Sequence, residues 1–212
     1  MDSKAHVAMS SPLEEAIDLG HRLITLAYGY YSHAAAIDLS FNKKVLRTLA
    51  SSGVIGWDSA GIAKKKNGES HKFLKTAWLE HDGFTEHIYN DLHRIWLLGA
   101  LIYSGDKLET YGYFDRSPCL ELIRHLRNAA AHNNRFRITK AGARGLEKYP
   151  AHTRDGPRGY PTNSVFEITP ALDGTLLMWD FMESGDILDA IISAGRYLQE
   201  RYAHEPPNRD RS

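Results

Sequence analysis

Two long stretches of this chain repeat apolar residues at the period of an α-helix, and they constrain the fold more than any other feature. The first stripe follows a helix start at Ser11-Pro12 and ends near Asp38, and the second precedes Ser104-Gly105-Asp106, which we expect to end it. The first stripe consists of Leu13, Ile17, Gly20, Ile24, Ala27, Tyr31 and Ala35, and the second of Leu74, Ala77, Phe84, Ile88, Leu92, Ile95, Gly99 and Ile102, with His81 at one of its positions. Helices of this length span about 40 Å, which favours lengthwise packing in a bundle.

Shorter patterns predict the other elements. We expect a short helix over residues 43–50 and a last helix over 187–202. Between them, after the two long helices, a third helix is expected over 118–133 and to end at Asn133-Asn134. The Gly- and Ser-rich residues 51–70 and the breaker-rich residues 142–161 are predicted to be connections.

A β-hairpin is predicted before the last helix, because two runs typical of strands flank Asp173-Gly174 in residues 164–181. The sequence therefore predicts an all-α, up-and-down helical bundle with a small β-hairpin insertion, as one domain over residues 11–203. Residues 1–10 and 204–212 are expected to be disordered.

Charge and composition narrow the classes of function. The 26 Lys and Arg residues balance the 26 Asp and Glu residues, so bulk electrostatics does not drive binding to a polyanion. A local basic excess nevertheless follows the third helix, between residues 133 and 160. Its members are Arg135, Arg137, Lys140, Arg144, Lys148, Arg154 and Arg158, against Glu147 and Asp155.

The compartment expected from the sequence is the cytoplasm. The beginning MDSKAHVAMSSP has no apolar core of a secretory signal, and no apolar run is long enough for a membrane span. The single cysteine, Cys119, lies among apolar residues and is interpreted as a packed thiol. We expect no metal and no cofactor, since phosphate-binding loops, CxxC pairs and shared-face histidine clusters are lacking.

The third helix carries the candidate site, in the stretch RHLRNAAAHNNRF. At 100° per residue, one face is apolar and is expected to face the core; it consists of Cys119, Leu122, Ile123, Leu126, Ala129 and Ala130. The other side carries Arg127, Asn128 and His132. Arginine suits phosphate oxygens and histidine transfers protons near neutral pH, which are the parts that metal-independent RNA cleavage requires. A polar helix face that is simply hydrated is the competing interpretation.

The segment Arg127-Asn128-Ala129-Ala130-Ala131-His132 resembles the R-x4-6-H signature of the HEPN superfamily. That resemblance implies an α-helical bundle that dimerises, with a composite ribonuclease site made by two copies. It also implies a place in bacterial toxin–antitoxin, abortive-infection or related defence systems, with an antitoxin or other defence protein as a partner. Arg127 and His132 would be catalytic and Asn128 would support them.

Four further residues are candidates for holding the RNA backbone: Arg124, His125, Arg135 and Arg137. Two alternatives stay open at this point. One is a catalytically silent HEPN-like module that binds a nucleotide, an RNA or a protein, and the other is a plain helical interaction protein.

Overall fold

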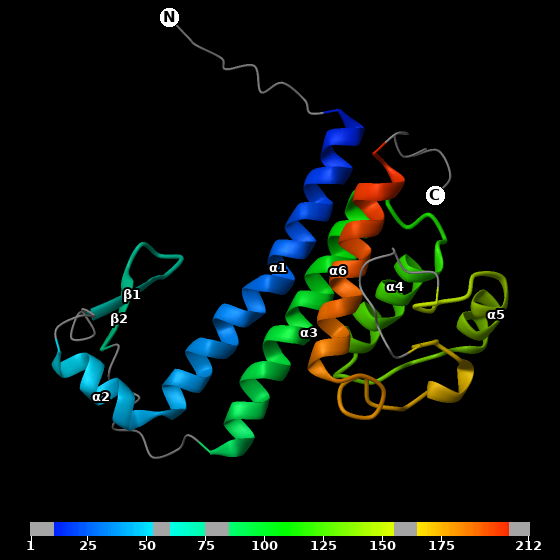
Figure 1. Ribbon diagram of the computed structural model, residues 1–212. Helices are drawn as coiled ribbons and strands as arrows, with labels where there is room; N and C mark the ends of the chain where they lie inside the picture. The colour runs from blue at the N-terminus through cyan, green and yellow to red at the C-terminus, as the bar shows by residue number, and fades with distance from the viewer. Residues whose placement is uncertain (1–10, 53–59, 75–84, 155–164, 204–212) are drawn as a thin grey trace, which may run out of the picture. The chain divides into compact units, whose positions relative to one another are not determined.

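The computed structural model describes residues 11–52, 60–74, 85–154 and 165–203, and it is mostly helical (Figure 1). Within these ranges the chain forms six α-helices, one short 3-10 helix and one two-stranded sheet. It divides into two compact units, residues 1–30 with 94–212 and residues 31–93. The expectation of one domain over residues 11–203 stays a prediction, and the predicted disordered ends lie outside the described residues.

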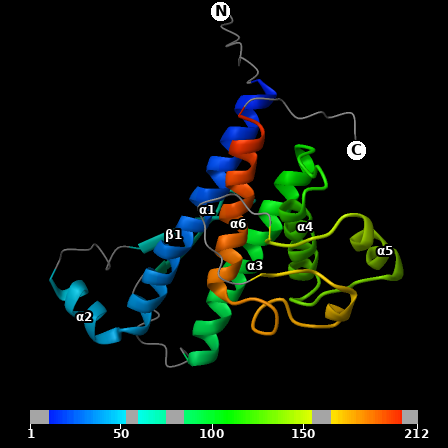
Figure 2. The same ribbon diagram turned by 45° about the vertical axis from the view of Figure 1, so that its right-hand side comes forward.

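The first unit is built on α1 (Pro12–Phe41), α3 (Glu86–Thr110), α4 (Pro118–Ala131) and α6 (Ser184–Arg201). Figure 1 and Figure 2 show successive helices of this set running in alternating directions, as in an up-and-down bundle. The part of α1 up to residue 30 belongs to this unit, as does α3 from residue 94. The prediction of a mainly helical fold is confirmed.

The packing of α1 against α6 depends on two glycines. A Cβ added to Gly20 would lie 2.5 Å from the Gly195 carbonyl oxygen, and one added to Gly195 would lie 2.7 Å from the Gly20 carbonyl oxygen. No real Cβ atom tolerates such distances, so the two backbones approach closely only because neither residue has a side chain.

The core-facing side predicted for α4 is confirmed. All six apolar residues named for that face are buried: Cys119, Leu122, Ile123, Leu126, Ala129 and Ala130. They pack with buried residues of the other bundle helices, such as Leu23, Leu101 and Ile191. Each such leucine or isoleucine contributes about 1.5–3 kcal/mol of hydrophobic free energy relative to exposure.

The predicted bounds of the second long helix were wrong at both ends. Leu74 belongs to strand β2, and α3 is observed from Glu86; residues 75–84 lie outside the described residues. At its other end α3 continues through Ser104-Gly105-Asp106 to Thr110. The Ser104 hydroxyl donates to the Ala100 carbonyl at 2.7 Å, so this residue satisfies its polar group inside the helix instead of ending it.

The second unit contains α2 (Lys43–Ser51), β1 (Ala60–Lys64) and β2 (Ser70–Leu74). The two strands pair antiparallel with Ala60 opposite Leu74, which corrects the prediction that residues 51–70 are only a connection. Asn67-Gly68 supplies the turn, where Gly68 has a φ of 86° that a residue without a side chain adopts at no steric cost.

The hairpin predicted over residues 164–181 was wrong, although residues on both sides of Asp173-Gly174 do pair. Residues 166–168 bond to residues 151–153, and residues 174–177 bond to residues 134–136. A short 3-10 helix, η2 (Pro170–Leu172), lies between the two. Helix α5 (Lys140–Lys148) occupies part of the predicted connection and is capped by Thr139, whose hydroxyl accepts from the Gly142 amide.

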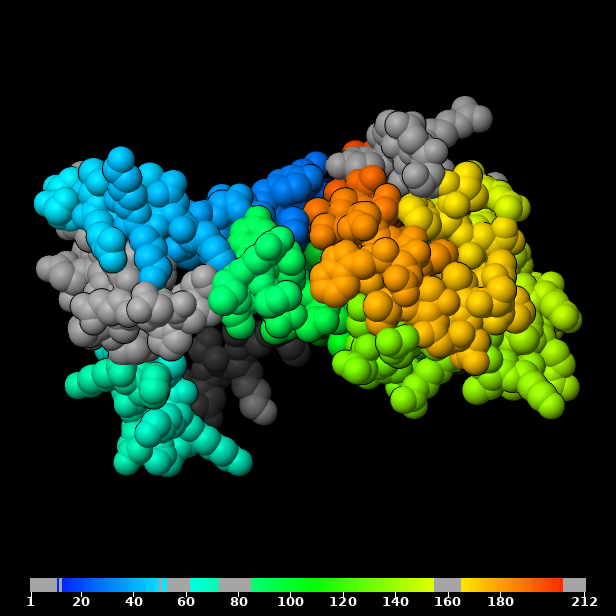
Figure 3. Space-filling view, turned by 90° about the horizontal axis from the view of Figure 1, so that it is seen from below, coloured from blue at the N-terminus to red at the C-terminus, as the bar shows by residue number. Residues whose placement is uncertain are grey.

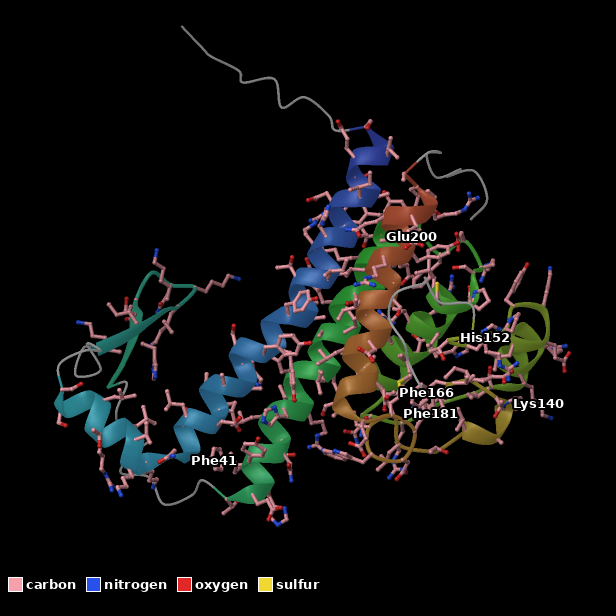
Figure 4. All side chains as sticks on the ribbon, in the orientation of Figure 1. Phe41, Lys140, His152, Phe166, Phe181 and Glu200 are labelled. Atoms are coloured by element: carbon pink, nitrogen blue, oxygen red, sulfur yellow. The ribbon has the colours of Figure 1, made fainter. Side chains whose placement is uncertain are left out.

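Aromatic rings hold these paired segments together. The Phe181 ring lies 5.2 Å from the Phe136 ring and 5.4 Å from the Phe166 ring, both edge to face. Figure 4 shows Phe166 and Phe181 next to each other, while Lys140 lies farther out at the start of α5. The irregular part of the first unit is therefore anchored to the segment that directly follows α4.

Candidate functional site at the end of α4

Arg127 is held against α3 by an ion pair. Its Nε donates to Asp106 Oδ1 at 2.8 Å and its Nη2 donates to the same oxygen at 2.5 Å. Its Nη1 donates to Asn128 Oδ1 at 3.2 Å. The Arg127 side chain keeps 31% of its surface exposed, so part of the side chain is accessible to a ligand.

Gly105 creates the space that the Arg127 side chain occupies. A Cβ at residue 105 would lie 2.5 Å from Arg127 Cγ and 2.7 Å from Arg127 Cβ. The aliphatic part of the arginine therefore crosses α3 at a glycine, where α3 carries no side chain, directly beside the Asp106 carboxylate. Sequence reasoning treated Gly105 and Asp106 as a helix end and missed both roles.

His132 and Asn128 lie at the exposed end of α4. His132 is the first residue after the helix, with φ −100° and ψ 44°, and its backbone N–H donates to the Asn128 and Ala129 carbonyls. The side chains of Asn128 and His132 are exposed. Among the described residues, Arg127 makes its polar contacts with Asp106 and Asn128 and none with His132. One chain thus presents the arginine and the histidine separately.

The turn after His132 has a fixed left-handed conformation. Asn133 and Asn134 have φ values of 58° and 62°, a region in which asparagine is strongly enriched. The helix itself ends at Ala131, two residues before the predicted Asn133. The buried Asn134 amide accepts from the Met178 N–H at 2.9 Å and donates to the Met178 carbonyl at 3.5 Å. The hydrogen bonding of Asn134 to Met178 was not predicted from the sequence, although the Asn-Asn pair marked this turn.

The four residues predicted to hold RNA are in different environments. The Arg124 guanidinium lies 4.3 Å from the centre of the Phe114 ring, and its Nε is 3.3 Å from a carboxylate oxygen of the buried Glu121. Burial, reinforced by the Arg124 charge, lowers the pKa of the half-buried His125. Arg135 donates to the Gly174 carbonyl at 2.7 Å, and Arg137 is exposed. Arg124 and His125 lie on α4, whereas the other two lie on the segment after it.

Other reactive groups have structural surroundings. Cys119 is buried, and burial raises the pKa of its thiol to about 11, which confirms the interpretation of a packed thiol. Within the described ranges, no group of three or more His, Cys, Asp or Glu side chains could hold a metal ion. None of the helices in the described part of the chain is long and apolar enough to cross a membrane.

Comparison of this chain with protein-family models, with curated proteins and with solved structures finds no match in any of the three.

Proposed function

We propose that this protein is a metal-independent endoribonuclease of a bacterial defence or toxin–antitoxin system, acting in the cytoplasm as a HEPN-type homodimer. The observation that carries the proposal is the end of α4, where a rigidly held Arg127-Asn128 pair precedes the exposed His132. The R-x4-6-H spacing supports it from the sequence side. An antitoxin or another defence protein would be its protein partner.

Arg127 would bind the scissile phosphate. A guanidinium has five N–H donors, and three of those of Arg127 are used by Asp106 and Asn128, which leaves two for phosphate oxygens. Because the arginine is already ordered by Asp106, less side-chain entropy is lost when it binds the substrate. Its positive charge would stabilise the negative charge that builds up on the phosphate in the transition state.

His132 would transfer protons. A 2′-hydroxyl of the RNA gives its proton to an imidazole and its oxygen bonds to the adjacent phosphorus. The bond from phosphorus to the 5′-oxygen breaks, and that oxygen takes a proton from an imidazolium, leaving a 2′,3′-cyclic phosphate and a 5′-hydroxyl. One chain supplies one such histidine, so two copies of α4 would supply the base and the acid, with Asn128 orienting a histidine.

A catalytically silent HEPN-like module is the second candidate. The observation that favours it is the same ion pair, because Asp106 offsets the charge of Arg127 and no contact joins Arg127 to His132 in one chain. Such a module would bind a nucleotide, an RNA or a protein partner through its arginines, and it would tolerate loss of His132.

The deciding experiment is cleavage of a mixed pool of labelled RNAs by purified protein in excess EDTA. We expect wild type to cleave, and His132→Ala and Arg127→Ala to lose about 100-fold or more of the rate. His87→Ala and Arg47→Ala, which remove an exposed histidine and an exposed arginine elsewhere, are the matched controls. Loss of cleavage in all variants alike, or cleavage that survives His132→Ala, would reject the assignment.

A further inference from the structure

Trp179 is an exposed tryptophan in a strained backbone conformation. Its φ is 81°, in the left-handed region that bulky residues rarely adopt, and 44% of its surface is exposed. Backbone strain of this kind lowers the stability of the fold, and strained residues concentrate at binding and catalytic sites. Neither burial nor backbone preference accounts for a tryptophan at this position.

The turn that carries Trp179 is fixed on both sides. The Trp179 N–H donates to the Met182 carbonyl at 3.0 Å, and the Met182 N–H donates to the Leu177 carbonyl at 2.9 Å. Met178 and Met182 are buried, at 1% and 2% exposure, so the residues around the tryptophan anchor the turn in the core. Figure 3 shows the orange atoms of this part of the chain on the surface, beside lime-green atoms of the residues that follow α4.

The same turn is bonded to the candidate site. Asn134, two residues after His132, makes both of its side-chain hydrogen bonds to the backbone of Met178, which directly precedes Trp179. Trp179 is therefore held near the end of α4 by a short, rigid path. The guanidinium of Arg94 of α3 lies over the indole ring, with its central carbon 5.4 Å from the ring centre.

We propose that Trp179, with Arg94 over its ring, is a stacking platform for an unpaired base of single-stranded RNA bound at the end of α4. An indole stacks on any nucleobase, and a guanidinium next to it adds a cation that favours the phosphate chain. Bases of an A-form duplex are already stacked on one another, so their faces are not accessible to an indole and the platform selects unpaired RNA. This inference rests on the proposed ribonuclease function in that the bound RNA is the substrate.

Tyr103 provides a matched comparison within the same chain. It is exposed to nearly the same extent, 41%, and Lys107 Nζ lies 5.5 Å from its ring centre. Tyr103 lies within α3, however, and is not among the residues with a positive φ. Tyr103 with Lys107 is thus an exposed aromatic ring paired with a cation, without the backbone strain of Trp179 and without its hydrogen-bonded link to the segment after His132.

The test is the affinity of the full chain for a labelled, short 2′-O-methyl oligoadenylate, which has no 2′-hydroxyl and is not cleaved. Fluorescence anisotropy in EDTA is expected to give a Kd about 5- to 100-fold weaker for Trp179→Ala and Trp179→Gly. Trp179→Phe keeps an aromatic face and should retain most of the affinity, and Tyr103→Ala should match wild type. Because glycine relieves the strain at φ 81°, Trp179→Gly should not lower the Tm.

The outcomes separate this inference from the proposed function. If wild type cleaves normal RNA and Trp179→Ala binds the oligomer within twofold of wild type, the platform is overturned and the ribonuclease stands. If Trp179→Ala weakens binding selectively while wild type cleaves no RNA, the platform stands and the ribonuclease is rejected. Wild type that binds no oligomer, or a Tyr103→Ala variant weakened as much as Trp179→Ala, also overturns the platform.

Discussion

Replacing Gly105 with alanine tests the close packing that fixes Arg127. In an unconstrained helix position this change stabilises a protein by about 1 kcal/mol, because alanine has the higher helix propensity. At residue 105 the new methyl group would lie 2.5 Å from Arg127 Cγ and 2.7 Å from Arg127 Cβ, and the latter atom moves only with the α4 backbone. Overpacking of this kind costs about 1–3 kcal/mol.

Loss of the Arg127–Asp106 ion pair adds to that cost. Both side chains are partly exposed, so solvent screening limits this contribution to about 0.5–1 kcal/mol. With the helix-propensity gain subtracted, we expect Gly105→Ala to destabilise the fold by about 0.5–3 kcal/mol. For a chain of this size, each kcal/mol corresponds to a Tm decrease of about 2–4 °C.

Urea unfolding followed by circular dichroism measures this difference, and Gly99→Ala is its control. Gly99 lies in the same helix, and a Cβ there would meet no atom within 4 Å, so alanine should stabilise at that position. Arg127→Ala should rescue Gly105→Ala only in part, since it removes the Cγ contact and leaves the Cβ contact. Equal stabilisation by Gly105→Ala and Gly99→Ala would refute the reasoning.

Further predictions concern charge, pH and thiol reactivity. Asp106→Asn keeps a side chain of the same shape but removes the carboxylate charge that offsets Arg127. We expect tighter RNA binding, and about 10-fold slower single-turnover cleavage because the guanidinium is no longer held in place. An unchanged cleavage rate would contradict the positioning role of Asp106. The lowered pKa of His125 means that the unfolded chain binds more protons than the folded one. Its contribution to stability is therefore complete above the unfolded pKa of about 6.5 and is lost as the pH falls through the folded value. Urea unfolding between about pH 7 and pH 5 should accordingly show a smaller pH dependence for His125→Gln than for wild type, and parallel curves would disprove this. Cys119, with its pKa raised to about 11, should resist a thiol reagent in the folded protein at about pH 8 and react quickly in urea; rapid labelling without denaturant would show that the thiol is not packed.

Helices α1, α2, α4 and α6 and the core side of α4 could be predicted because helical periodicity is a local property. The buried residues Leu122, Leu126 and Ala129 are spaced so that one face of any helix there is apolar. That α4 ends close to Asn133-Asn134 was also predictable, since asparagine tolerates the left-handed conformation of the turn that follows the helix.

The prediction of strand pairing failed because strand pairing is not a local property of the sequence. Residues 164–169 and 175–181 have the composition of a hairpin, but described residues of each run pair with a more distant segment, 151–153 or 134–136. Asp173, expected in the hairpin turn, uses its carboxylate to accept from the Ile138 N–H at 2.8 Å. Which segments meet depends on where the helices place them, and composition carries no information on that.

The sequence by itself determined the helical architecture and drew attention to Arg127, Asn128 and His132, because spacing along one helix fixes which residues share a face. Only the tertiary structure showed that Arg127 crosses α3 at Gly105 to reach Asp106, and that Asn134 ties the turn of Trp179 to the end of α4. These contacts join residues far apart in the chain. They arise from the packing of helices and segments against one another, which no local pattern encodes.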